Sequence, residues 1–425
     1  MNSQCEVLRA DLKIEGGRIQ AIGRNLPQRG SSVLDATGRF VLPGFVQTHV
    51  HLCQTIMRGA ADDLALLDWL KQRIWPFEAA HDERSIRASA QLGLAELIRG
   101  GTTTLLSMET IHHTDIVFEE ARRSGLRAII GKCLMNTGRG TPKRLLQPAR
   151  QAFRECEALH RSWHNTSEGR IQLALAPRFI LSCTESLLRE TDCLARGWGL
   201  LVHTHASENR DEVRCVRQRT SWGNIEAFDR WGMLHHRLCL AHCVWPSPRE
   251  RLLLRESQAK VLHCPSSNLK LGSGIAPIWE FHQAGVQVSL GADGAACNNN
   301  LDMFQEMRLA ALLQKALHGP KAMPARTVLE MATMGGARAL GLDRELGSLE
   351  IGKRADMILV NPGKLHSTPH GDPISSLVYS SRQSDVETCL VDGHILMKDK
   401  DLLTMDRERI LRESQKQFQR LAARV

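Results

Sequence analysis

Two histidines separated by one residue, His49 and His51, are the first residues whose types and spacing could do chemistry. They end the run FVLPGFVQTHVHL, whose apolar character predicts a buried strand. Because alternate residues of a strand point to the same face, both imidazoles would enter one pocket. Alone, the pair is equally consistent with two hydrogen-bonded histidines at a strand end. A catalytic zinc site needs at least three protein ligands, so the others must come from elsewhere in the chain.

Histidine and acidic residues recur where later apolar segments end. The segment LLVHTHASE carries His205 and Glu208, and two further segments end in His242 and Asp293. The carboxyl ends of parallel barrel strands meet at one rim, so these side chains would converge with the first histidine pair. The sequence therefore predicts a metal site with acid–base groups beside it.

Short apolar segments alternate with longer segments of helical character through the middle of the chain, which predicts parallel strand pairing. The expected strands are residues 40–49, 102–108, 126–135, 170–176, 200–205, 237–243, 260–265 and 286–293. The expected helices are residues 63–100, 114–124, 142–164, 184–197, 210–232, 246–258 and 276–285. Eight parallel strands close a barrel, so we expect an α/β fold with a (β/α)8 TIM-like barrel.

Both ends of the chain contain short strands with glycine turns. Residues 11–23 alternate around Gly16 and Gly17, which predicts a hairpin, and residues 347–360 and 386–397 have the same character. Neither end could bury a sheet alone, so we expect one small β-sandwich built from both termini. The expected domains are residues 1–42 for its N-terminal part, 43–345 for the metal-dependent barrel, and 346–425 for its C-terminal part with a terminal helix.

Composition narrows the class of protein. Hydrophobic residues make up 42% of the 425, which is globular composition with a large core. The net charge of +9 is spread over interspersed basic and acidic residues, which argues against a nucleic-acid partner. Twelve cysteines form no CxxC pair, and no long apolar segment occurs, so we expect a reduced, cytoplasmic chain without a membrane partner. Self-association into a homo-oligomer is left open.

The ordered motifs GGRIQAIG, PGFVQTHVHL, HTHASEN, LAHCVW, HCPSSNLKLGSG, GADGAACNNNLDMF and GSLEIGKRADMIL run through the whole chain. With them the chain resembles the amidohydrolase superfamily, in the branch of aminohydrolases that includes adenosine-derivative deaminases, guanine deaminase and triazine hydrolases. The resemblance implies one divalent metal ion, zinc first and iron or manganese as alternatives, held by the ligands His49, His51, His205 and Asp293. It also implies that His242 and Glu208 contact the attacking water.

Within this branch the chain is most similar to deaminases of 5′-deoxyadenosine, methylthioadenosine and S-adenosylhomocysteine. PFEA and CNNNLDMF carry that resemblance, which implies that Glu78 contacts ribose hydroxyls. Arg178 in APRFILSCT departs from the usual histidine and resembles guanine deaminase and the 5′-deoxyadenosine group. It would contact substrate or pair with a nearby carboxylate. The N-terminus also lacks a strand that relatives place before DLKIEGG, so the small domain is trimmed or the chain begins late.

The expected reaction is hydrolytic deamination of a 5′-modified adenosine to the inosine derivative and ammonia. Glu208 would move a proton from water to the ring nitrogen, His242 would orient the water, and Asp293 would pass a proton to the leaving ammonia. Glu208 and Asp293 would thereby also contact the substrate. The alternatives are a deaminase of guanine or another purine- or pterin-like base, a triazine hydrolase, and a catalytically silent scaffold protein.

The remaining histidines are expected to do no direct chemistry. His203 shares a strand face with His205 but lies one layer deeper, which favours a core or supporting role. His263 at the end of the seventh strand is expected to be supporting or structural. Two adjacent pairs are expected in loops or at helix ends: His112 with His113, and His235 with His236.

Overall fold

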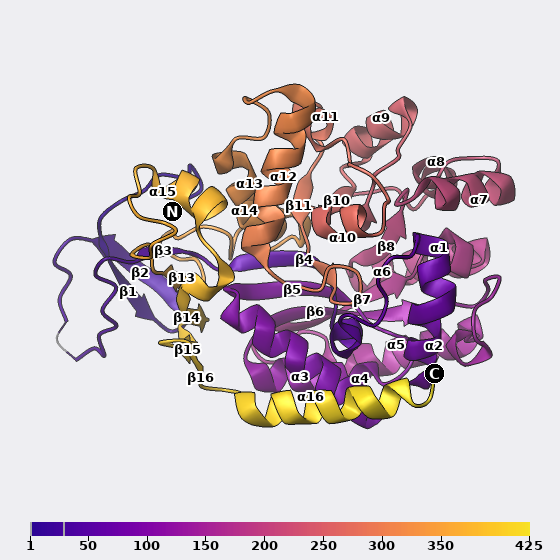
Figure 1. Ribbon diagram of the computed structural model, residues 1–425, viewed down its shortest axis with the longest axis horizontal. Helices are drawn as coiled ribbons and strands as arrows, with labels where there is room; N and C mark the ends of the chain where they lie inside the picture. The colour runs from indigo at the N-terminus through magenta and orange to yellow at the C-terminus, as the bar shows by residue number, and fades with distance from the viewer. Residues whose placement is uncertain (1, 29) are drawn as a thin grey trace.

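The computed structural model, which describes residues 2–28 and 30–425, is built around a curled sheet of parallel strands (Figure 1). The strand order is β11-β10-β9-β8-β7-β6-β5-β4-β12. The bounds are β4 Phe45–His51, β5 Thr102–Met108, β6 Arg127–Leu134, β7 Ile171–Pro177, β8 Val202–Ala206, β9 Leu238–His242, β10 Lys260–His263, β11 Val288–Leu290 and β12 Asp293–Gly294. The two ends of this order, β11 and β12, are separated by only Gly291 and Ala292, and β12 pairs with β4. The sheet therefore closes on itself, and the expected TIM-like barrel is confirmed.

The strands are apolar on both faces because both faces are buried. Val46, Leu106, Ile129 and Cys239 belong to a cluster that fills the inside of the barrel. The alternate side chains pack against the surrounding helices. This arrangement explains why the barrel strands read as continuous apolar runs in the sequence.

The prediction of one strand over residues 40–49 is wrong, because these residues belong to two sheets. β3 (Phe40–Pro43) pairs antiparallel with β13 (Met357–Val360) in the small domain, whereas β4 pairs in parallel with β5. The chain changes sheet at Gly44, where any side chain would collide with Thr103. One continuous apolar segment of the sequence therefore contains the passage of the chain from the small domain into the barrel.

The eighth expected strand, residues 286–293, is also interrupted. Between β11 and β12, side chains of β4 form hydrogen bonds with the backbone. Thr48 Oγ1 donates to the Leu290 carbonyl at 3.0 Å, and Gln47 Oε1 accepts from the Ala292 amide at 3.2 Å. The interruption turns the chain so that Asp293 lies beside β4.

The helices surround the barrel, but several predicted boundaries are wrong. Residues 63–100 form four segments, since Asp82 caps a new helix through Ser85, and residues 210–232 form two helices. Four helices after β12, α12 to α15, were not predicted, whereas α16 corresponds to the expected terminal helix. The helices are α1 Leu66–Trp69, the π-helix η2 Leu70–Ile74, α2 Trp75–Ala80, α3 Glu83–Arg99, α4 Thr114–Ser124, α5 Ala149–Trp163, α6 Glu185–Trp198, α7 Arg210–Thr220, α8 Asn224–Arg230, α9 Pro248–Ser257, α10 Pro265–Lys270, α11 Ile278–Gln283, α12 Met303–His318, α13 Ala325–Ala332, α14 Met334–Ala339, α15 Pro373–Ser375 and α16 Arg407–Ala422.

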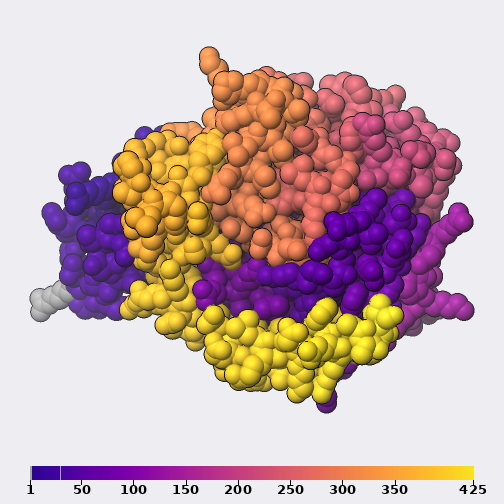
Figure 2. Space-filling view, viewed as in Figure 1, coloured from indigo at the N-terminus to yellow at the C-terminus, as the bar shows by residue number. Residues whose placement is uncertain are grey.

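A small β-domain is assembled from both ends of the chain, as expected. The hairpin of β1 (Asp11–Glu15) and β2 (Arg18–Gly23) forms one sheet, and β3 joins β13, β14 (Val386–Val391), β15 (His394–Lys398) and β16 (Asp401–Leu402) in the other. Ile19 of the hairpin packs with Met357 and Leu390 of the larger sheet. N-terminal and C-terminal segments lie together at the left of the molecule in Figure 2.

The C-terminal helix α16 returns from the small domain and lies along α3 at the lower edge of the barrel (Figures 1 and 2). Beyond its end, Arg424 binds Asp82 at 2.9 Å. The last residues of the chain are thereby joined to the start of α3.

Two findings bear on the environment of the protein. Among the described residues, no helix combines the length and apolar character needed to cross a bilayer. The twelve cysteines are free thiols, and most of them are buried.

Candidate active site

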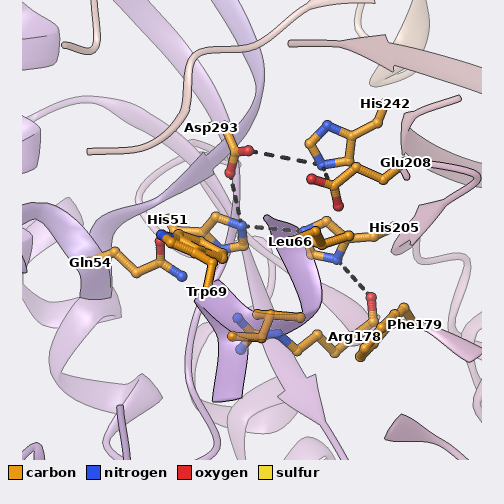
Figure 3. Close-up of a pocket in the computed structure, with 11 residues that line it drawn as sticks. His51, Gln54, Leu66, Trp69, Arg178, Phe179, His205, Glu208, His242 and Asp293 are labelled. Atoms are coloured by element: carbon orange, nitrogen blue, oxygen red, sulfur yellow. Dashed lines mark hydrogen bonds and ion pairs between the residues drawn. The ribbon is translucent and has the colours of Figure 1, made fainter. Parts of the chain in front are cut away.

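Four predicted metal ligands meet at the carboxyl end of the barrel, and Figure 3 shows three of them, His51, His205 and Asp293. His49 and His51 come from β4, His205 from β8 and Asp293 from β12. Asp293 Oδ1 lies 3.3 Å from His49 Nε2 and 3.2 Å from His51 Nε2. His205 Nε2 lies 3.4 Å from His51 Nε2. The HxH pair, the end of the fifth barrel strand and the end of the eighth are thus brought to one point.

Three of the separations between these atoms equal the edge of a tetrahedral metal site. Zinc–nitrogen bonds of about 2.0–2.1 Å and tetrahedral angles separate neighbouring ligand atoms by about 3.3–3.4 Å. The separations of 3.2–3.4 Å match that edge length. In addition, His49 Nε2 is buried and has no hydrogen-bond partner among the described residues. An unsatisfied imidazole nitrogen facing a carboxylate and two further imidazoles is what a divalent ion would satisfy.

The ligand rings are oriented by hydrogen bonds at their other nitrogen. His51 Nδ1 donates to the Met108 carbonyl and His205 Nδ1 to the Arg178 carbonyl, each at 2.7 Å. With the proton held on Nδ1, Nε2 presents its lone pair to the centre of the site.

Electrostatics keeps the ligands in their metal-binding forms. Burial lowers the pKa of His49 to about 4 and holds the pKa of His205 well below its ordinary value. Burial would raise the pKa of Asp293, but His49 and His51 outweigh it and the pKa lies well below its usual range. Neutral imidazoles and an ionised carboxylate are the states that bind a metal.

Glu208 and His242 lie beside this cluster. Glu208 Oε2 is 3.5 Å from His242 Nε2, which is itself 3.9 Å from Asp293 Oδ2. Burial, Asp293 and Glu212 raise the pKa of Glu208 well above its ordinary value, which favours a carboxyl group that keeps a proton. A group of this kind can deliver a proton to a substrate nitrogen.

The backbone of His242 is strained, and a hydrogen bond fixes the orientation of its ring. Its backbone has φ = 75°, in the left-handed region that non-glycine residues rarely adopt, and its Nδ1 lies 2.9 Å from Asn268 Oδ1. Asn268 holds the proton on Nδ1, so that Nε2 is the nitrogen turned toward Glu208 and Asp293.

The predicted substrate residues Glu78 and Arg178 are bound to each other. Arg178 Nη1 donates to Glu78 Oε2 at 2.5 Å, and Gln54 Nε2 donates to Glu78 Oε1 at 2.9 Å. Arg178 and Gln54 line the pocket, whereas Glu78 is not among its lining residues. The pairing of Arg178 with a carboxylate, one of two alternatives drawn from the sequence, is therefore what the structure contains.

The pocket beside the cluster is narrow. Its cavity volume is about 20 Å³, room for about one water molecule. A nucleoside would need α1 and η2 to move, since these segments supply the apolar wall. The lining residues are His51, Gln54, Leu66, Trp69, Leu70, Arg178, Phe179, His205, Glu208, His242 and Asp293.

Sequence reasoning missed several of these residues. Gln54 lies in LCQTIMRG directly after the HxH pair and Asn268 in HCPSSNLK, so motif position could have identified both. Leu66, Trp69 and Leu70 read as ordinary helix-core residues and carried no such signal.

The other histidines do not line the pocket, as expected. His203 binds His49 from the inner layer at 2.7 Å. His263 is buried at the end of β10. His112 Nε2 binds the Arg144 carbonyl at 2.8 Å, and His235 Nε2 binds Asp192 at 2.7 Å, both outside the pocket.

The chain is similar to known proteins over most of its length and most of theirs. The model of the amidohydrolase family matches residues 40–396. A 5′-deoxyadenosine deaminase from Methanothermobacter thermautotrophicus is 41% identical over 409 residues, covering 95% of this chain and 93% of that protein. A 5-methylthioadenosine/S-adenosylhomocysteine deaminase from Moorella thermoacetica is 40% identical, covering 90% and 87%. The crystal structure of an adenosine deaminase from Xanthomonas campestris with bound zinc has a TM-score of 0.91 at 30% identity, covering 97% and 94%.

Proposed function

The chain belongs to the amidohydrolase family, and we propose that it is a metal-dependent deaminase of a 5′-modified adenosine, with 5′-deoxyadenosine as the first candidate. The products are the corresponding inosine and ammonia. The observation that carries the proposal is the meeting of His49, His51, His205 and Asp293 at the carboxyl end of the barrel, with Glu208 and His242 beside them. Relatives named as deaminases of 5′-deoxyadenosine and of methylthioadenosine and S-adenosylhomocysteine support it.

The four ligands would hold one divalent ion, and zinc suits their nitrogen and oxygen atoms, with iron and manganese as alternatives. A bound ion of this kind lowers the pKa of water so that hydroxide is available near neutral pH. The zinc in the Xanthomonas campestris structure supports this choice.

The residues beside the ligands would move the protons. A ring carbon bearing an amine becomes a good electrophile when the adjacent ring nitrogen is protonated, and Glu208 can supply that proton because its raised pKa keeps the carboxyl protonated. His242 would orient the attacking water through Nε2. Asp293 has a second oxygen, Oδ2, which accepts from Ser267 at 2.6 Å. The Asp293 carboxylate would take a proton from the attacking water and pass it to the departing ammonia.

Arg178, Gln54 and Glu78 would bind the polar end of the substrate. Glu78 can accept from two ribose hydroxyls after the wall of the pocket opens, while Arg178 offers donors only and suits a ring nitrogen or an oxygen. Arg139, the only arginine of residues 135–142, is the candidate for binding a homocysteine carboxylate, but it is exposed and is not among the pocket-lining residues. A small 5′ group therefore fits better than a homocysteine tail.

The test is ammonia release from the zinc-loaded protein with adenosine, 5′-deoxyadenosine, methylthioadenosine, S-adenosylhomocysteine and guanine. We expect the highest kcat/KM with 5′-deoxyadenosine. Free adenine serves as a matched control that lacks the ribose, and its kcat/KM should fall by at least about tenfold, since each lost hydrogen bond to a charged group costs roughly 1.5–3 kcal/mol. No release from any nucleoside would contradict the proposal.

A guanine deaminase is the second candidate, because Arg178 lines the pocket and could read the guanine oxygen. The same panel separates the two functions. A kcat/KM for guanine at least about tenfold above that for 5′-deoxyadenosine, a difference of about 1.4 kcal/mol, would favour this alternative. An s-triazine included in the panel tests the hydrolase alternative in the same way.

A further inference from the structure

His203 contacts a proposed metal ligand from inside the barrel. It lies on β8 two residues before His205, and its side chain is completely buried. Its Nε2 is 2.7 Å from His49 Nδ1, and the two rings are nearly perpendicular at 89°. The contact is a hydrogen bond between two imidazoles.

This partner differs in kind from those of the other histidine ligands. His51 and His205 donate to backbone carbonyls, which can only accept a hydrogen bond. An imidazole nitrogen accepts only when it carries no proton. The orientation of His49 therefore depends on a second side chain. Among the three histidine ligands, His49 is the one whose hydrogen-bond partner a substitution can remove.

Only one arrangement of protons is compatible with metal binding. Two nitrogens 2.7 Å apart share one proton. A metal needs the lone pair of His49 Nε2, so the proton of His49 must lie on Nδ1 and must point at His203. His203 Nε2 must then be unprotonated, and the proton of the neutral His203 ring lies on its own Nδ1.

We propose that His203 is a positioning residue that fixes His49 in its metal-binding tautomer by accepting a hydrogen bond at Nε2. This inference rests on the proposed metal site. Burial of an imidazole in the inner layer costs free energy unless the ring is hydrogen-bonded. Among the described residues, Nε2 of His203 is paired with His49 and its Nδ1 has no partner. Packing alone would be served by an apolar side chain at this position.

The experiment measures metal retention rather than turnover. Zinc-loaded parent protein, His203→Leu and His203→Gln are mixed with a chromogenic chelator, and the rate and equilibrium of zinc transfer are recorded. Loss of the hydrogen-bond acceptor should weaken zinc binding by about 10–100-fold in His203→Leu. The amide oxygen of His203→Gln can still accept, so this variant should stay within about threefold of the parent.

A matched control separates the hydrogen bond from packing. Cys239 lies opposite His203 on the neighbouring strand β9, in the same buried layer. Cys239→Ala removes volume from that layer without touching a ligand, and its zinc affinity should equal that of the parent. Equal losses in His203→Leu and His203→Gln, or no loss in His203→Leu, would overturn the inference.

A measurement on the parent protein keeps the inference testable if His203→Leu does not fold. Nitrogen-15 NMR of the zinc-loaded protein labelled at histidine should show the His203 proton on Nδ1, with the signal identified by its loss in His203→Gln. A His203 proton on Nε2, or a parent protein that binds no zinc, would overturn the inference. A parent that binds zinc with this tautomer but deaminates no nucleoside would contradict the proposed function alone.

Discussion

Arg178 and Glu78 form a buried ion pair at the polar end of the pocket, with 2.5 Å between Nη1 and Oε2. Burial alone would lower the pKa of Arg178, but the charge of Glu78 outweighs it and raises the pKa above its ordinary value. Gln54 also donates to Glu78, so one carboxylate orients both polar groups that line this end of the pocket. Glu78 therefore acts on the pocket through its neighbours before any substrate enters.

Removal of one partner of this pair should destabilise the protein. Arg178→Met leaves the Glu78 carboxylate buried without its counter-charge, and breaking a buried pair in this way typically costs about 3–5 kcal/mol. Urea unfolding of the variant and the parent measures the loss. The double variant Arg178→Met, Glu78→Leu is the control and should regain most of the stability, because both charges are gone. An Arg178→Met protein as stable as the parent would show that the pair does not stabilise the fold.

The sequence could identify both residues but not their pairing. Glu78 and Arg178 are 100 residues apart, on α2 and after β7, and their contact depends on how the segments after β4 fold over the barrel. The helical periodicity of residues 63–100 does not predict the π-helix η2 or the helix cap at Asp82. These two features determine how the segment crosses the barrel. The positions of the proposed metal ligands were predictable because each lies at the end of a barrel strand, where the fold itself fixes position.

The barrel could be predicted for the same reason, whereas its interruptions could not. Apolar runs mark buried strands, but a run does not reveal that β3 and β4 belong to different sheets. That crossing follows from the close approach of Gly44 to Thr103, a contact between residues far apart in sequence. The boundaries of the small domain therefore remain a prediction, and limited proteolysis can test them.

The proposed acid–base role of Glu208 predicts a separation of metal binding from turnover. Glu208→Gln keeps the size of the side chain and leaves His49, His51, His205 and Asp293 unchanged. We expect bound zinc at the level of the parent and a kcat lower by roughly 10²–10⁴, the usual contribution of general acid–base catalysis. Metal analysis and ammonia release on the same sample check both parts. Parent-like turnover would exclude Glu208 as the proton carrier.

Metal removal should abolish activity and lower stability together. A ligand that binds only the folded state stabilises it by about 2.7 kcal/mol at a concentration of 100 times its Kd. Dialysis against a chelator should therefore lower the midpoint of thermal unfolding, and one equivalent of zinc per chain should restore both quantities. Asp293→Ala is the matched control and should show a smaller response to zinc. A dialysed protein with full activity would contradict a metal-dependent mechanism.

Arg127 links the barrel to the small β-domain. At the start of β6 it binds Asp356 at 3.0 Å and Asp392 at 2.7 Å, and all three side chains are buried. Arg127→Met leaves buried Asp356 without its ion-pair partner, whereas Asp392 keeps Arg354 at 3.3 Å and Arg170 at 3.6 Å. We expect a loss of about 3–5 kcal/mol in the free energy of unfolding. Thermal unfolding measures it, and Arg123→Met on the exposed end of α4 is the control, with an expected loss below about 1 kcal/mol.

Buried His81 should make the protein sensitive to acid. Its Nδ1 contacts Ser85 Oγ at 2.8 Å and its Nε2 contacts the Cys53 carbonyl at 2.9 Å, and burial lowers its pKa to about 4. The unfolded chain takes up the proton near pH 6.5, whereas the folded chain does so only near pH 4. Between these values the unfolded state binds more protons, so stability falls as the pH drops from 6.5 to 4.

The predicted loss from His81 is about 3 kcal/mol over that window, from a difference of about 2.5 pKa units at about 1.4 kcal/mol each. Urea unfolding at several pH values should give a flatter pH dependence for His81→Gln than for the parent, since the amide cannot titrate. His394→Gln, at an exposed position of β15, is the matched control and should lose stability with falling pH as the parent does. If His81→Gln and the parent lose stability in parallel between pH 6.5 and 4, the acid sensitivity arises from other groups.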